Sequence, residues 1–284
     1  MTRERRTEND TGLGGKIRHW LRSHPATYLV STTAIVVLIM NFFRGETLGD
    51  FALQSLVLAL FMGFALYLFD KECLGYLRLK DLKQVWPICI SLLLIAFAVC
   101  VALWMHFQGE YGPFEGKAFE KFFLLAVLCV FTGYFEESLF RGVLFQALSI
   151  GLSGQENPAL KAALVSAALF GLFHVSAGIP TADLSDGLVL AQALLKTTQA
   201  ALFGFVMAAL FFRTKNIWLL ATIHALNNIF MALPQLLFTG NLSTNYLSGN
   251  SFEVAILGAT ILLYLPLAGL SIKHLKAVPM IEKP

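Results

Sequence analysis

Residues 122–152 read FFLLAVLCVFTGYFEESLFRGVLFQALSIGL. The stretch is apolar over a length that can cross a bilayer, and its only charged residues are Glu136, Glu137 and Arg141. Placing a charge at the bilayer centre costs roughly 2.5–3.5 kcal/mol, so ionisable groups at that depth indicate function. The alternative interpretation is an ion pair that joins two helices, or a segment that lies among the lipid headgroups.

The whole chain has the composition of a membrane protein. Of its 284 residues 57% are hydrophobic and 14% are charged, whereas a soluble domain has about 25% charged residues. We predict an all-α integral membrane protein with about eight transmembrane helices, which leaves no room for a soluble catalytic domain. The predicted spans are Ala26–Phe43, Asp50–Phe69, Val85–Phe107, Phe122–Leu152, Ala159–Ala177, Thr197–Phe212, Ile217–Phe238 and Val254–Ile272. The stretch Ile179–Leu195 is ambiguous and could include a short interfacial helix.

Loop charges orient these spans. Of the 21 Lys and Arg residues, sixteen fall on the side of the N-terminus and three on the opposite side. This positive-inside bias predicts that both termini are cytoplasmic. The expected organisation is a cytoplasmic basic tail over 1–25, a single polytopic membrane domain over 26–272 with its catalytic core at 122–231, and a cytoplasmic C-terminal tail over 273–284. No basic stripe with interleaved aromatic residues suggests nucleic-acid binding.

Two further spans carry polar residues at depth. His174 lies late in the fifth span, and the seventh span contains His224 and Asn228 four residues apart. Residues at this spacing lie on one face of a helix and can reach a common target. Asn227 lies about a quarter turn away and is assigned to helix packing.

The same geometry separates the two glutamates. Glu137 and Arg141 are four residues apart and form a natural ion pair within the helix. Glu136 points about 100° away, so its carboxylate is the one left for chemistry. With the two histidines and the asparagine, it supplies a base, an orienting group and hydrogen-bond donors, which is enough to activate water and to stabilise an oxyanion.

Other site chemistries must be weighed against this one. Two histidines and a glutamate can hold a catalytic zinc ion, but the chain has no H-E-x-x-H helix, and Arg141 would repel a cation. A serine protease has less support, because no G-x-S-x-G surrounds Ser138, Ser166 or Ser176. Lys196 falls near a predicted span boundary, where its side chain is expected to extend to the interface.

Two functions from other classes stay open. The chain could be a non-catalytic membrane scaffold or a bacteriocin-immunity protein that keeps the polar cluster for helix packing. It could also be a proton-coupled transporter, because intramembrane Glu, His and Arg suit a proton relay. A transporter of this kind is expected to show a repeat between its halves, and the sequence has none.

The polar motifs together resemble the signature of a known family. Motifs of the form E-E-x-x-x-R, F-x-x-x-H and H-x-x-x-N occur in this order at Glu136-Glu137 and Arg141, at Phe170 and His174, and at His224 and Asn228. They are similar to those of the CPBP family of intramembrane glutamic endopeptidases, named for CAAX-processing and bacteriocin-processing enzymes and also called Abi. The resemblance covers about Phe122–Met231.

The resemblance implies a role for each motif residue. Glu136 activates the attacking water with help from His174, His224 and Asn228 form the oxyanion hole, and Glu137 and Arg141 hold the arrangement electrostatically. It also implies hydrolysis of a peptide bond without metal, cofactor or covalent intermediate. The expected partners are the lipid bilayer and a membrane-associated protein or peptide substrate. This substrate is a prenylated CAAX protein, a secreted peptide or a C-terminal sorting helix. The expected location is the plasma (inner) membrane of a bacterium.

Overall fold

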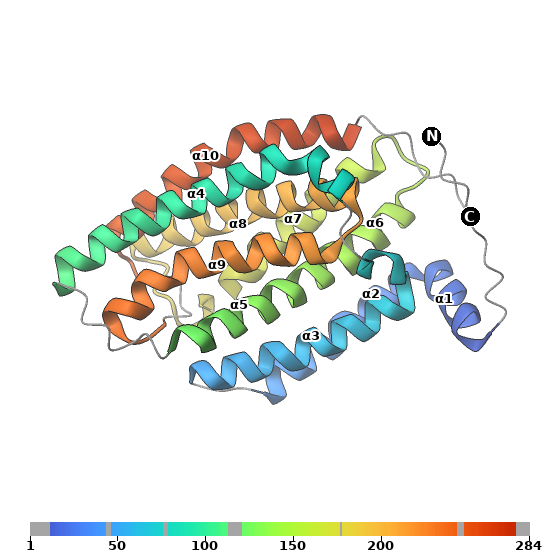
Figure 1. Ribbon diagram of the computed structural model, residues 1–284, viewed down its shortest axis with the longest axis horizontal. Helices are drawn as coiled ribbons and strands as arrows, with labels where there is room; N and C mark the ends of the chain where they lie inside the picture. The colour runs from blue at the N-terminus through green and yellow to red at the C-terminus, as the bar shows by residue number, and fades with distance from the viewer. Residues whose placement is uncertain are drawn as a thin grey trace.

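The computed structural model describes residues 12–43, 47–75, 79–112, 121–176, 178–242 and 247–276. All regular structure in these ranges is helical, as the composition predicts (Figure 1). The α-helices are α1 (Leu13–Ser23), α2 (Pro25–Phe42), α3 (Leu48–Asp70), α4 (Leu79–Tyr111), α5 (Phe122–Glu137), α6 (Gln146–Gly151), α7 (Pro158–Ser176), α8 (Gly187–Thr214), α9 (Ile217–Thr239) and α10 (Ser251–Lys276). The shorter segments are the 3₁₀ turns η1 (Lys71–Leu74) and η4 (Ile179–Thr181) and the π-helix η3 (Ser138–Phe145).

Within the described ranges, eight helical segments are long and apolar enough to cross a membrane, so the predicted number of spans is confirmed. These segments are Pro25–Phe42, Leu48–Leu74, Val85–Tyr111, Phe122–Gly151, Pro158–Thr181, Gly187–Thr214, Ile217–Thr239 and Ser251–Lys276. The cytoplasmic placement of both termini stays a prediction.

The predicted start of the sixth span is wrong. Helix α8 begins at Gly187, capped by the Asp186 side chain that accepts from the Leu188 N–H, and not near Thr197. The expected interfacial helix is a three-residue turn, η4, and the remainder of that ambiguous stretch belongs largely to α8. The error arises because Gln192 and Lys196 lower the hydropathy of the first ten residues of α8, although Gln192 is buried in the bundle.

The expected N-terminal tail contains a helix in its described part. Helix α1 covers the basic segment and has no buried residue. It lies outside the bundle beyond the end of α2 (Figure 1). Arg22 fastens it to α3, since its guanidinium donates to the Phe69 carbonyl at 3.0 Å and to the Asp70 carboxylate at 3.2 Å. Residues 1–11 of the expected tail lie outside the described residues.

Helix α5 and the π-helix that follows it form the centre of the bundle. Helix α5 packs against α3 and α9, as Figure 1 shows, while α8 packs against α7 and α10. All residues from 133 to 147 are buried. The charged hexad of the sequence therefore lies in the interior of the protein and does not face lipid.

A glycine permits the close approach of α5 and α9. A Cβ atom on Gly133 would lie 2.9 Å from the carbonyl oxygen of Ala221 and 3.1 Å from the amide nitrogen of Ala225. Both contacts are to backbone, which cannot turn away as a side chain can. Small residues at such positions let membrane helices pack backbone to backbone. Gly133 thus sets the spacing between the helices that carry Glu136 and His224.

We expect Gly133→Ala to destabilise the protein by about 1–3 kcal/mol, the usual cost of overpacking a close contact. The matched control is Gly258→Ala in α10, where an added Cβ would have no neighbouring atom within 4 Å and alanine favours the helix. Thermal unfolding of the purified proteins in detergent measures both. Equal melting temperatures for the two variants would contradict the proposed contact between α5 and α9.

Candidate active site

Glu136 and Glu137 are the last two residues of α5, where the α-helix passes into the π-helix η3. Both side chains are buried, and Arg141 in η3 is fully buried. The Arg141 guanidinium donates to Glu137 Oε1 at 3.2 Å, so the predicted ion pair is confirmed. Single π-helical turns are uncommon and occur frequently at functional sites.

Arg141 also joins η3 to two other helices. Its second terminal nitrogen donates to the Gly204 carbonyl of α8 at 3.0 Å, and its guanidinium lies 4.3 Å from the centre of the Phe170 ring of α7. A Cβ on Gly204 would lie 3.0 Å from Arg141 Nη2, so glycine leaves the room that the guanidinium occupies. One buried cation therefore contacts a carboxylate, a carbonyl and an aromatic face.

His224 of α9 contacts both glutamates. Its Nδ1 lies 2.7 Å from Glu137 Oε1, and its Nε2 lies 3.5 Å from Glu136 Oε2. Because the Glu137 carboxylate pairs with Arg141, it acts as an acceptor, and Nδ1 of His224 carries a proton. The contact with Glu136 is attractive when a second proton lies on Nε2 or on the Glu136 carboxyl group. His224 and Glu136 are thus placed to share a proton.

His174 of α7 approaches the same Glu136 oxygen as His224 does. Near the end of α7, its Nδ1 lies 2.9 Å from the Phe170 carbonyl, and its Nε2 lies 3.8 Å from Glu136 Oε2. A carbonyl oxygen only accepts hydrogen bonds, so Nδ1 carries the proton and Nε2 presents a lone pair toward Glu136. The predicted base and its histidine partner therefore meet from α5 and α7, at a separation that suits a bridging water.

These side chains line a cavity of about 400 Å³ inside the bundle. The sequence-predicted residues Glu136, His174, His224 and Asn228 all border it. Glu137 and Arg141 lie behind this wall, where they contact His224 and α8. Much of the rest of the wall is apolar, including Leu58, Leu125, Phe135, Phe170, Phe173, Phe203 and Met231.

Three further polar residues border the cavity, although the sequence analysis assigned none of them to the site. Asn227, assigned to packing, borders the cavity together with Asn228, and its buried Oδ1 has no hydrogen-bond partner. Lys196 and Gln199 also border it, whereas Lys196 was expected to extend to an interface. The placement of α8 decides this difference, because Lys196 lies more than two turns after its first residue. The i,i+3 spacing of Lys196 and Gln199 was the available signal.

The structure also places the residues of the rival chemistries. Of the three candidate serines only Ser176 borders the cavity, and its hydroxyl donates to the Phe173 carbonyl at 2.8 Å. Among the described residues, no set of three His, Cys, Asp or Glu side chains is arranged to hold a metal ion.

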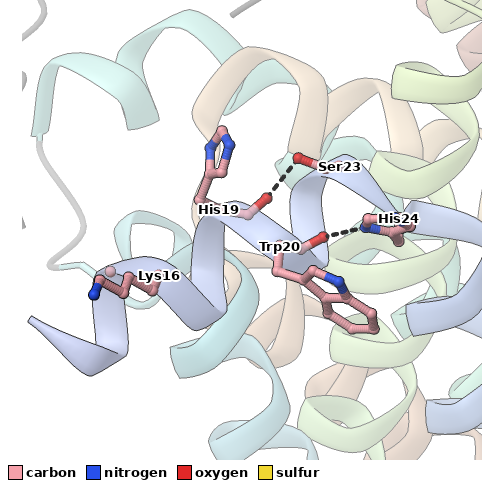
Figure 2. Close-up of a pocket in the computed structure, with 6 residues that line it drawn as sticks. Lys16, His19, Trp20, Ser23 and His24 are labelled. Carbon is pink, nitrogen blue, oxygen red and sulfur yellow. Dashed lines mark hydrogen bonds between the residues drawn. The ribbon is translucent and has the colours of Figure 1, made fainter.

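A second hollow, of about 530 Å³, lies against α1 and away from the charged hexad. Figure 2 shows the side chains along it, with Ser23 and His24 bonded to backbone carbonyls of the preceding turn. It is lined by Gly15, Lys16, His19, Trp20, Ser23 and His24. None of the motif residues borders it, so the cavity within the bundle is the candidate active site.

Residues 118–230 match the family model described as type II CAAX prenyl endopeptidase Rce1-like. This segment is similar to the Rce1-like family and covers less than half of the chain. The match agrees with the resemblance drawn from the motifs, and it contains all of the predicted site residues from Glu136 to Asn228. A search of curated proteins found no match. The chain is thus a multi-helix membrane protein, and residues 118–230 are similar to a CAAX protease family.

We expect Arg141→Met to destabilise the protein by about 3–5 kcal/mol, because it leaves the Glu137 carboxylate buried without its cation. The control is Arg22→Met, which removes a partly exposed pair with Asp70 and should cost no more than about 1 kcal/mol. Thermal unfolding and the yield of folded protein measure both effects. Similar losses in the two variants would show that the buried pair has no special structural weight.

Proposed function

We propose that this protein is a metal-independent intramembrane glutamic endopeptidase. In this proposal it hydrolyses a peptide bond in a membrane-associated protein or peptide. The observation that carries the proposal is the convergence of Glu136, His174 and His224 from three membrane-spanning helices on one cavity. An acid–base set at the wall of a largely apolar cavity is a physical signature of a catalytic site.

The attacking group in this mechanism is a water molecule held between Glu136 and His174. As the water oxygen bonds to the carbonyl carbon, its proton passes to Glu136, and His174 Nε2 accepts a hydrogen bond that holds the water in place. When the tetrahedral intermediate collapses, the carbon–nitrogen bond breaks and the proton moves from Glu136 to the departing amine. The products are a carboxylic acid and an amine, and no covalent enzyme intermediate forms.

Two other residues of the cavity wall stabilise the oxyanion in this proposal. His224, protonated on Nε2, and the Asn228 amide both face the cavity and can donate to the negative oxygen of the intermediate. Glu137 holds the His224 ring through the 2.7 Å contact at Nδ1, and Arg141 holds Glu137. This chain of contacts fixes the donor before the reaction begins, which is how preorganised sites lower a barrier.

The substrate class follows from the family and from the composition of the wall. The matched family is described as a CAAX prenyl endopeptidase, so a peptide that carries a prenyl group near its C-terminus is one substrate class. Maturation of a secreted peptide is the other. The apolar residues along the cavity suit a lipidated or hydrophobic segment in either case. We propose that the protein acts in the plasma (inner) membrane of a bacterium, with both termini in the cytoplasm.

We expect Glu136→Gln and His174→Ala each to lower turnover by about 10²–10⁴-fold, the range that general base catalysis contributes. The membrane proteome and its released peptides are compared between cells that carry the wild type and each variant at equal protein levels. The control is Glu156→Gln. Glu156 is exposed and does not border the cavity, so this variant should process substrates as the wild type does. If the deletion phenotype is rescued by both active-site variants, the scaffold hypothesis takes the place of the peptidase.

We expect Asn228→Ala to lower turnover of a cleaved peptide by about 10²–10³-fold, as loss of one oxyanion donor does elsewhere. The change should appear mainly in kcat, because the donor acts on the charge that develops in the transition state. Steady-state kinetics of the purified protein separate kcat from KM. A change confined to KM would place Asn228 in ground-state binding instead.

We expect EDTA to leave the rate of the purified enzyme unchanged, because the proposed water is activated by side chains. The same preparation treated with EDTA and then supplied with zinc is the control. Loss of activity that zinc restores would favour a metal-dependent hydrolase in place of the glutamic mechanism.

A further inference from the structure

Lys196 is the only Lys or Arg among the described residues that line the cavity. It lies on α8, one turn before Gln199, and its ammonium group is 3.4 Å from the Gln199 Oε1. Gln199 is buried and borders the same cavity. The proposed mechanism assigns no role to either residue.

Helix packing brings Lys196 to the level of the catalytic groups. Helices α7 and α8 approach closely at Gly171, where a Cβ would meet the Thr197 carbonyl and lie 3.0 Å from the Ala201 Cβ. The two helices are connected through a short loop and pack side by side, so they run in opposite directions. A step of three residues toward the C-terminus of α7 therefore matches a step of three residues toward the N-terminus of α8. His174 therefore lies near the level of Lys196, and both side chains border the cavity together with Glu136.

Lys196 is the basic side chain that a bound anion in the cavity could reach. Arg141 pairs with Glu137 behind the cavity wall, and neither residue borders the cavity. Among the described residues that border it, Lys196 is the one Lys or Arg and Glu136 the one Asp or Glu, and they come from different helices. An anionic group that enters a cavity with mostly apolar walls needs a cationic partner to offset the loss of its hydration.

We propose that Lys196 binds a carboxylate of the substrate within a few residues of the scissile bond. The inference rests on the proposed function, because it takes Glu136 and His174 as the point of hydrolysis. The carboxylate could come from the C-terminus of the substrate or from an acidic side chain. Lys196 would then determine which peptides enter in the correct register, and so where the chain is cut.

A counter-ion role makes a different prediction. If Lys196 only balanced the charge of Glu136, its loss would weaken all substrates equally, whatever groups they carry. If it binds a substrate carboxylate, its loss weakens only the ligands that contain one. The comparison of paired ligands therefore separates the two roles.

The test uses the full chain in lipid nanodiscs and a farnesylated peptide that ends in cysteine, two aliphatic residues and methionine. A ketomethylene group replaces the peptide bond after the cysteine, so the probe binds without being cleaved. Three forms are compared: the free acid, the C-terminal amide, and the amide with glutamate in place of the last residue. Fluorescence anisotropy of the labelled probe gives the affinity of each form.

For the wild type we expect the free acid or the glutamate form to bind at least about tenfold more tightly than the simple amide, the usual range for a charge-assisted contact. In Lys196→Met the affinities should fall within about twofold of each other, while Lys196→Arg should keep the preference. Lys161→Met, an exposed lysine of α7, is the matched control and should behave as the wild type. Whichever form binds more tightly identifies the source of the carboxylate.

Two results would overturn the proposal: no preference in the wild type, or an undiminished preference in Lys196→Met. Equal weakening of every form would assign Lys196 to charge balance and also overturn it. Thermal unfolding confirms that each variant is folded, and Lys196→Arg reports on the site even if Lys196→Met is unstable. Hydrolysis of the ordinary peptide by the wild type is measured separately, so failure of the peptidase function is distinguished from failure of carboxylate binding.

Discussion

The structure depends on one buried ion pair, between Glu137 and Arg141. Neither side chain is exposed, and each would be costly alone in a low-dielectric interior. The pair is stable there because each partner has further contacts, Glu137 with His224 and Arg141 with the Gly204 carbonyl and the Phe170 ring. These contacts reach α7, α8 and α9 from one turn of η3. The same interaction that offsets the burial of charge also fixes the relative positions of the helices around the cavity.

Much of the fold could be predicted because its determinants are local. Eight apolar stretches of sufficient length follow directly from composition, and the Glu137–Arg141 pair follows from helical spacing. The separation of the two glutamates was also predictable, since a step of one residue turns the side chain by about 100°. Glu136 faces the cavity and both histidines, while Glu137 faces Arg141 and His224.

The errors concern properties that depend on tertiary packing. Hydropathy assigns a polar residue to the end of a span and so excludes the first ten residues of α8, although Gln192 is buried against the segment before α10. Asn227 is assigned to packing because a helical wheel does not indicate which neighbour covers each face. In the bundle both Asn227 and Asn228 border the cavity. The π-helix also escapes prediction, because no residue in Ser138–Phe145 distinguishes it from an α-helix.

The π-helix has a consequence for how this chain can change over evolutionary time. A π-helix is usually equivalent to an α-helix with one added residue, and its hydrogen bonds are the less favoured ones. Removing one residue from Ser138–Phe145 would restore ordinary α-helical hydrogen bonds and so make the backbone of this segment more stable. It would also rotate Glu136 by about 100° relative to the part of the helix beyond the deletion. The π-helix is therefore the segment of the bundle that would tolerate a deletion of one residue least. Lineages of this protein should vary in loop length while the length of this segment stays constant.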